Sequence, residues 1–503
     1  MLKQYKIPIT VIFGTVFFLA IAQMATGTSV PFAMEVAGTM ICIGLTFNLL
    51  GGISSVGGIA FAGFALSTIV ISQFAKALFL EPAQKNLEAP DLTIQVYFVF
   101  YLSVLVGTFV FGRLRIRLPK PLEPTTEVQA DLLYIISFVI GLISTTVFEY
   151  YEASEGQQTS QAHSIGLAFS SLLLLSIVIA VQSTIKKTDG RHSMGIKVIL
   201  PWVAVVFFGF IETSRGRIVL PAVVYALTCF VSGYRFKRRH YAVALMGIIL
   251  FQLFLSPLEI YSREYVRQED FRGRIYEAFF LAFNVPNWTE VRQFSQGGSG
   301  STGGGREEYY DRPGTFVLSR LSAIRADSNM ISACANGYHY GFEPLKTDIL
   351  HNLPRFIYPD KPDYDSAAFT GRVTGLNPDE VENAEAMITA VSDSFGAFGW
   401  IGVIAVGLIA FPASFIIYES IFDIRRPWGI VAIGGFCTTF SQVSLGGLFT
   451  SSIRTPISIV LLSYLVGIIL RMIPVQGAAH TSMRPATPAG ATPSDLAAPS
   501  TGV

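Results

Sequence analysis

The sequence predicts an all-α, polytopic membrane protein with about twelve transmembrane helices and one large helical loop outside the membrane. Hydrophobic residues make up 51% of the chain and charged residues only 14%, and the mean hydropathy is +0.50. Apolar stretches of about 20 residues, the length that crosses the hydrocarbon core as a helix, recur along the chain. Helices are expected because a helix satisfies its own backbone hydrogen bonds in lipid.

Nine apolar segments precede the large loop and three follow it. A short polar break separates each segment from the next, so we expect each to form one transmembrane helix. We place these helices near residues 7–25, 31–51, 56–80, 93–112, 131–148, 164–184, 197–213, 217–234, 241–258, 397–419, 428–449 and 455–473.

The distribution of basic residues predicts the orientation of these helices. Lys and Arg concentrate on the cytoplasmic side of membrane proteins. With the N-terminus inside, every second connection is basic, and both termini are expected in the cytoplasm. The basic groups are Lys3 and Lys6; Arg113, Arg115, Arg117 and Lys120; Lys186, Lys187 and Arg191; Arg235, Lys237, Arg238 and Arg239; and Arg425 and Arg426. A net charge of +1 gives no indication of nucleic-acid binding.

The long polar insertion divides the chain into four regions. Residues 259–396 carry 13 basic and 20 acidic residues and are expected outside, with amphipathic helices and a flexible glycine-rich insert at 295–305. The insertion separates an N-terminal transmembrane region, 1–258, from a C-terminal one, 397–473. The tail, 474–503, is rich in Pro, Ala, Thr and Ser and is expected to be disordered in the cytoplasm.

The first candidate binding motif runs from Glu212 to Arg217 (ETSRGR), at the predicted outer end of the seventh helix. Two arginines on an outward connection run against the usual charge bias. The guanidinium fork suits phosphate oxygens, so Arg215 and Arg217 are candidates to bind a lipid diphosphate at the membrane surface. The alternative is an ordinary pair of arginines that snorkel to lipid headgroups.

The second candidate motif runs from His351 to Pro362 (HNLPRFIYPDKP) in the outer loop. Its three prolines restrict the backbone, and they leave Arg355 and Lys361 on a rigid turn that suits a binding site. The alternative is a structural turn whose charges are merely solvated.

Carboxylates in the loop are candidates for acid–base or metal chemistry. Glu385 and Asp393 precede the point where the chain re-enters the membrane, and a carboxylate there can act as a base. Asp393 is also interpreted as the N-cap of the tenth helix. Asp363 and Asp365 have DxD spacing, but so short a triplet is common in any acidic loop, and we expect no metal site.

Three features together resemble the oligosaccharide repeat-unit polymerases, the Wzy-type O-antigen polymerase family of bacterial inner membranes. They are the ETSRGR turn, the PRFIYPDKP segment of the long outer loop, and the AVSDSFGAFGW re-entry. The resemblance covers about Glu212 to Trp400. It implies a GT-C-like glycosyltransferase that polymerises undecaprenyl-diphosphate-linked oligosaccharide at the periplasmic face, without a cofactor. Membrane lipids would be partners, and a chain-length regulator protein is left open as a further one.

The resemblance also implies residue roles. The diphosphate would be bound by Arg215, Arg217, Arg355 and Lys361. A base for the acceptor hydroxyl would come from one of three unranked candidates, Glu212, His351 and Asp393. No arginine motif is repeated in two outer loops, as is described for some members of the family.

Two other functions stay open. An O-antigen ligase would transfer a finished glycan from the same donor to a lipid A core, and a more prominent outer-loop histidine motif would be expected of it. A lipid-linked oligosaccharide flippase would perform no chemistry. Few charges lie deep within the predicted helices, which disfavours a transporter.

Overall fold

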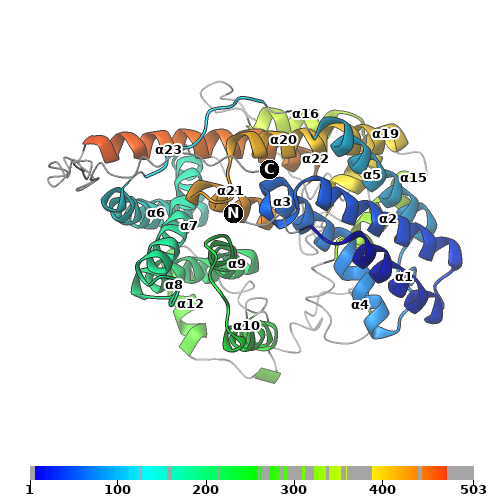
Figure 1. Ribbon diagram of the computed structural model, residues 1–503, viewed down its shortest axis with the longest axis horizontal. Helices are drawn as coiled ribbons and strands as arrows, with labels where there is room; N and C mark the ends of the chain where they lie inside the picture. The colour runs from blue at the N-terminus through cyan, green and yellow to red at the C-terminus, as the bar shows by residue number, and fades with distance from the viewer. Residues whose placement is uncertain are drawn as a thin grey trace, which may run out of the picture.

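A computed structural model gives the fold (Figure 1). It describes residues 6–472 except for these internal positions: 113, 115, 125, 156–160, 213, 256, 259–260, 262–270, 284–287, 290, 292–308, 312–321, 336–338, 353–357, 359–387 and 440–443. The described residues form helices and connections only, with no strand among them. The all-α prediction is therefore confirmed for this part of the chain.

The first five helices form four apolar segments joined by short turns, because α3 and α4 are parts of one span, Val56–Phe79. Gly27, with φ of 95°, turns the chain from the first helix into the second, and a proline begins the fifth. Such left-handed backbone is the conformation that glycine adopts most readily. The helices are α1 (Ile9–Ala25), α2 (Val30–Leu49), α3 (Val56–Ala65), α4 (Ile71–Phe79) and α5 (Pro90–Phe111).

The second group of helices contains the most extensive hairpin of the fold. In it α6 (Glu127–Glu155) and α7 (Gln161–Lys187) pack along their lengths. Further along the chain, α9 packs against both α7 and α8. The other helices of this group are α8 (Ile196–Ile211), α9 (Arg215–Val231) and α10 (Arg238–Leu250).

Four of the apolar spans each contain a single π-helical turn, at 66–70, 251–255, 406–410 and 450–454.

The large insertion contributes three described helices of ten residues or more before the chain returns to long apolar ones. The insertion helices are α12 (Phe271–Phe283), α15 (Ile324–Ala335) and α16 (Glu343–Asn352). The C-terminal helices are α19 (Ala390–Ala405), α20 (Phe411–Ile421), α21 (Pro427–Thr439), α22 (Leu445–Phe449) and α23 (Thr455–Met472).

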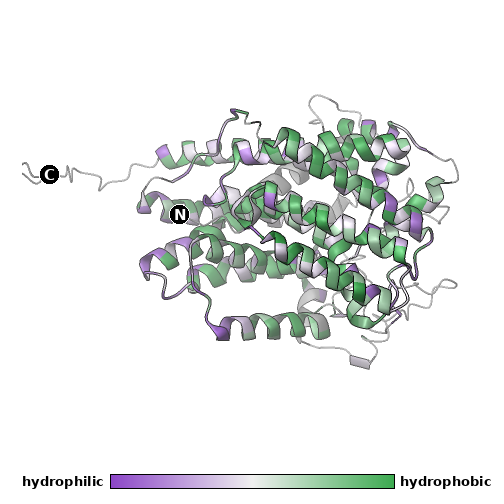
Figure 2. Cartoon of the chain, turned by 45° about the vertical axis from the view of Figure 1, so that its right-hand side comes forward, coloured by the Kyte–Doolittle hydropathy of each residue, from purple (hydrophilic) through white to green (hydrophobic). Residues whose placement is uncertain are grey.

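Eight helices of the described chain are long and apolar enough to cross a membrane. Four shorter apolar helices, of 10–17 residues, account for the other predicted segments. Each of the twelve predicted segments thus coincides with a helix, while the number of twelve crossings stays a prediction. The tenth lies in a helical stretch from Ala390 to Ile421 that is interrupted by non-helical backbone at Phe398 and Gly399, so the long apolar part begins close to the predicted residue 397. Figure 2 shows hydrophobic helices whose hydrophilic residues gather at their ends.

Small residues allow the central helices to pack closely. A Cβ atom on Gly107 of α5 would lie 2.2 Å from the carbonyl oxygen of Leu408. A Cβ atom on Gly407 would lie 2.8 Å from the carbonyl oxygen of Phe100. Close approach of backbones at small residues is how helices associate in membranes, where lipid is as apolar as leucine.

Lysine ion pairs mark one end of the bundle, which we call the basic end. Lys187 and Lys197 each bind Asp131 at 3.1 Å, and these contacts join the end of α7 to the starts of α6 and α8. Trp428 donates a hydrogen bond of 2.9 Å to the carbonyl of Leu122, so the α5–α6 connection and the start of α21 lie at this end too.

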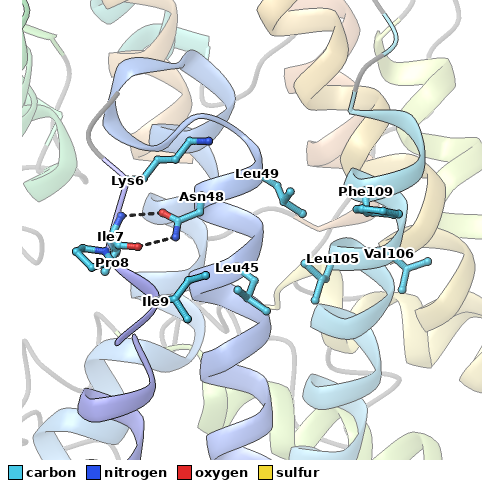
Figure 3. A pocket seen from close by; sticks show the side chains of 10 residues that line it. All are labelled: Lys6, Ile7, Pro8, Ile9, Leu45, Asn48, Leu49, Leu105, Val106 and Phe109. Carbon is cyan, nitrogen blue, oxygen red and sulfur yellow. Dashed lines mark hydrogen bonds between the residues drawn. The ribbon is translucent and has the colours of Figure 1, made fainter. Parts of the chain in front are cut away.

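The start of α1 and the end of α2 belong together as well. The amide side chain of Asn48 accepts a hydrogen bond from the Ile7 N–H and donates one to the Ile7 carbonyl, at 2.8 and 2.7 Å. Figure 3 shows this pair beside a cavity of about 670 Å³ whose other wall is formed by Leu105, Val106 and Phe109 of α5. The cavity lies between α1, α2 and α5, and most of its lining side chains are apolar.

Described parts of the insertion pack on the opposite end, which we call the insertion end. Ser328 of α15 accepts hydrogen bonds from the Ala89 N–H and from Thr93 at the start of α5. Asp311 accepts one from Lys85 in the α4–α5 connection. The predicted separation of basic connections from the insertion is therefore seen at two ends of the bundle, whereas which end faces the cytoplasm stays a prediction.

Candidate functional site

A cluster of one arginine and two glutamates lies where the ETSRGR motif folds, and we call it the arginine cluster. Nη1 of Arg217 donates to Oε1 of Glu149 at 2.6 Å and to Oε2 of Glu212 at 2.7 Å. Glu149 belongs to α6, which begins at the basic end, so its last turns reach the other end of the bundle. The cluster thus lies toward the insertion end.

The sequence around Arg217 determines how it meets Glu212. Glu212 is the C-cap of α8, and Ser214 is the N-cap of α9, its hydroxyl accepting a hydrogen bond of 3.4 Å from the Arg217 N–H. So short a turn brings the two charged side chains together. Gly209 permits the close approach of the helices, because a Cβ atom there would lie 3.0 Å from the Ile218 nitrogen.

Burial distinguishes the three charged groups. The Glu149 side chain is fully buried, whereas those of Arg217 and Glu212 are 17% and 24% exposed. A charge buried without a partner would be costly, so Glu149 depends on Arg217. The three groups sum to a charge of −1, and an anion that bound Arg217 would have to replace one of its carboxylate partners.

The insertion reaches this cluster. Helix α12 packs against α6 and α8, with the Phe271 ring 5.8 Å from the Tyr150 ring. Tyr150 directly follows Glu149 in α6. An insertion helix therefore lies directly beside the arginine cluster.

Comparison with models of known families, with curated proteins and with solved structures finds no match for this chain. The sequence motifs and the geometry of the side chains are therefore the basis for a functional proposal.

The structure places Asp393 in the first turn of α19, where both carboxylate oxygens are occupied. Oδ1 accepts a short hydrogen bond from the Tyr340 hydroxyl, and Oδ2 accepts one of 2.6 Å from the Leu445 N–H. The interpretation of Asp393 as an N-cap is wrong, because Thr389 is the cap residue and its hydroxyl accepts from the Val391 N–H. Asp393 joins the insertion to α22 instead.

A second buried aspartate, Asp327 of α15, was not among the sequence candidates. Its carboxylate accepts hydrogen bonds from the hydroxyls of Tyr97, Thr389 and Ser392 and from the Thr389 N–H. Burial raises the pKa of Asp327 to about 6, against the opposing effect of these donors. One carboxylate thus fastens α15 to α5 and to the start of α19.

Asp327 carries a sequence signal that was overlooked. It lies three residues after Ile324 and four before Ile331, both of which are fully buried. These spacings put it on the apolar face of an amphipathic helix. A carboxylate on such a face requires a partner elsewhere in the fold.

The remaining candidates are only partly placed. Arg215 is the first residue of α9 and His351 lies in the last turn of α16, but the structure describes only their backbone. Helix α16 packs against α22, so His351 belongs to a different part of the insertion end from Arg217. Arg355 and Lys361 lie outside the described residues, as do Glu385 and the Asp363–Asp365 triplet.

Metal ligands are not clustered in the part of the chain that the structure describes: no group of three or more His, Cys, Asp or Glu side chains there could hold an ion.

Proposed function

We propose that this protein is a membrane glycosyltransferase that polymerises undecaprenyl-diphosphate-linked oligosaccharide repeat units, at the periplasmic face of a bacterial inner membrane. The proposal rests on the resemblance of the ETSRGR, PRFIYPDKP and AVSDSFGAFGW segments to the repeat-unit polymerases. The observation that carries it is the arginine cluster, a partly exposed guanidinium at the insertion end, beside an insertion helix.

The arginine cluster holds the turn that carries a second arginine, Arg215, at the insertion end. Guanidinium donors match the oxygens of a diphosphate, and the ion pairs of Arg217 fix this turn in place. Fixed charges that face a leaving group stabilise the negative charge that develops on it. A diphosphate leaving group is the kind of substrate that such a site favours.

The arrangement suggests different roles for the two arginines. Arg217 is already paired with both Glu149 and Glu212, so in this proposal it positions the connection between α8 and α9. Arg215, at the N-terminus of α9, would then contact the diphosphate together with Arg355 and Lys361. The positive end of the α9 helix dipole would add to this attraction.

The candidates for the base are not equivalent in this structure. Both oxygens of Asp393 are already hydrogen-bonded in a buried position, and an oxygen of Glu212 is bound to Arg217. His351 lies on α16, whose partner is α22 rather than the arginine cluster. Of the three, Glu212 is closest to the proposed diphosphate site, and we place the acceptor hydroxyl beside it.

Glycan length in the native host tests the proposal. The gene would be deleted and complemented with wild type, Arg215→Ala or Arg355→Ala, and Arg117→Ala at the basic end would serve as the matched control. We expect deletion to leave single repeat units on the final acceptor. Arg215→Ala and Arg355→Ala should express in the membrane and fail to restore the ladder of glycan lengths, while the Arg117→Ala control restores it.

Two other outcomes would contradict the polymerase. Long chains that persist on undecaprenyl diphosphate without reaching their acceptor would identify a ligase. Repeat units that accumulate on the cytoplasmic side would identify a flippase, and the proposed roles of the arginines would then be withdrawn.

A further inference from the structure

A small cavity lies at the basic end, far along the chain from the proposed catalytic residues. Its volume is about 170 Å³. The α5–α6 connection, α6, α23 and Trp428 form its walls. We call it the Glu123 cavity, after the only acidic residue among those that line it.

The wall that carries Glu123 is held firmly. The Leu122 N–H donates to the Ser463 hydroxyl at 3.1 Å, and the Leu122 carbonyl accepts from Trp428 at 2.9 Å. Gly467 gives Leu122 room, because a Cβ atom there would lie 2.7 Å from Leu122 Cδ1. The position of Glu123 is therefore set by contacts with two separate helices.

The Glu123 carboxylate has an oxygen in need of a donor. Its Oε2 is buried, and no group in the described part of the chain donates a hydrogen bond to it. A buried acceptor without a donor is costly, and in a lined cavity it indicates an absent partner. A ligand that brings an N–H or O–H donor would satisfy it.

The charges around the cavity define what that ligand carries. Burial raises the pKa of Glu123 to about 8, opposed by Arg426 and assisted by Asp423 in the turn before α21. From α23, Arg471 lines the cavity, and α6 contributes the uncharged Gln129 and Leu133. An acidic residue, Glu123, and a cationic residue, Arg471, therefore line the same small cavity.

We propose that the Glu123 cavity binds the headgroup of a zwitterionic aminophospholipid, with its ammonium at Glu123 and its phosphate at Arg471. The ammonium supplies the donor that Oε2 lacks, and the phosphate suits a guanidinium. Val466 and Leu470 of α23 provide apolar wall for the adjoining chains. The buried Trp428 of α21 lines the cavity and keeps its N–H on the Leu122 carbonyl.

The apolar cavity beside Asn48 provides a contrast. It is larger, at about 670 Å³, and its one charged lining residue is Lys6. Acyl chains could enter it, but it holds no acid for an ammonium. Selection of one headgroup over another is therefore expected only at the Glu123 cavity.

Binding of short-chain phosphatidylethanolamine to the purified full-length protein tests the proposal. The matched probes are phosphatidylglycerol, which lacks the ammonium, and phosphatidylcholine, whose quaternary ammonium has no N–H. We expect wild type to prefer phosphatidylethanolamine roughly tenfold, the difference that one charge-assisted hydrogen bond provides. Glu123→Gln should remove this preference. Arg471→Gln should weaken the binding of all three lipids. The control, Glu343→Gln on the exposed side of α16, should leave the binding of all three unchanged.

The pH dependence gives a second readout that a merely structural role would not produce. An ammonium requires the ionised carboxylate, so affinity in wild type should rise at least tenfold from pH 6 to pH 8 and be flat in Glu123→Gln. Equal binding of all three probes, or a preference that survives Glu123→Gln, would overturn the proposal. Arg484 belongs to the C-terminal tail, which follows α23. Lipid binding that appears only in Arg484→Ala would also overturn the proposal, because the tail rather than a lipid would then occupy the cavity in the wild-type protein.

Discussion

Asp327 shows how a single residue can hold an insertion onto a membrane bundle. Four donors from α5 and from the start of α19 converge on one buried carboxylate. Each such hydrogen bond contributes about 1 kcal/mol, and each donor left buried without an acceptor costs more. The contact therefore stabilises the fold, which is a different role from that of a catalytic group open to substrate.

The raised pKa of Asp327 predicts a pH dependence of stability. Its pKa of about 6 lies above the ordinary value of 3.8, so the folded state holds the proton more tightly than the unfolded chain does. This contribution is complete below about pH 4 and is lost as pH rises to about 6. Relative to Asp327→Asn, the free energy of unfolding of wild type should fall by up to about 3 kcal/mol between pH 4 and pH 7.

Thermal unfolding of both proteins in detergent at each pH measures this difference. Glu343→Gln on the exposed side of α16 is the control and should follow wild type. A difference between wild type and Asp327→Asn that does not change with pH would show that Asp327 is ionised throughout.

At the scale of elements, two ion pairs of different burial lie where a short insertion segment meets the end of α4 and the α4–α5 connection. Lys76, fully buried, binds Glu81 at 2.9 Å and lies 4.4 Å from the Tyr309 ring centroid. Lys85 binds Asp311 at 2.6 Å with both side chains exposed. Residues 309–311 thereby rest on the α4–α5 connection.

The buried pair should dominate the attachment. Lys76→Met leaves Glu81 buried without its cation, so we expect a loss of about 3 kcal/mol in the free energy of unfolding. The matched change Lys85→Met at the exposed pair should have a much smaller effect, because water screens exposed ion pairs. Hydrogen exchange of the segment around Tyr309, with unfolding in detergent, measures both. Equal effects of the two changes would contradict the burial argument.

The extent to which elements could be predicted follows from how each one is stabilised. Apolar segments form helices in lipid whatever surrounds them, so all twelve were located from composition and length. The short helical segment before the kink at Phe398 and Gly399 was not predicted, because its residues Ser392, Asp393 and Ser394 are polar in sequence although the structure buries them. Within the insertion, amphipathic helices were expected, and α15 and α16 are two of the described ones.

The site was less predictable than the helices because its contacts join distant residues. The ETSRGR turn placed Glu212 near Arg217, since only four residues separate them. Glu149, 68 residues away, could not be paired with Arg217 from periodicity alone. The same holds for Asp393 and Leu445, whose contact depends on how α22 packs against α19.

At the scale of the whole molecule, the basic end and the insertion end should lie on opposite sides of the membrane. Single cysteines at Asp189, in the turn after α7, and at Glu343, on α16, test this in intact cells. The native Cys42, Cys229 and Cys334 are buried, and the fourth cysteine, Cys437, is replaced by serine so that the labelling background stays low. A membrane-impermeant thiol reagent should label the cysteine at 343 and spare the one at 189.

Permeabilised cells should label both positions, which shows that each cysteine is reactive. Labelling of 189 alone in intact cells would invert the predicted orientation, and the proposed periplasmic reaction would be withdrawn with it.

The fastening of α15 limits how this protein can be recombined. Tyr97 and Thr389, the partners of Asp327, lie 230 residues before it and 62 after it. A chimera that exchanged the outer loop for that of another protein would strand the Tyr97 hydroxyl in an apolar interior unless α5 were exchanged too. For the proposed polymerase, specificity for a new glycan is therefore expected to change by substitutions within the loop and its matching membrane helices together, rather than by transfer of the loop as a module.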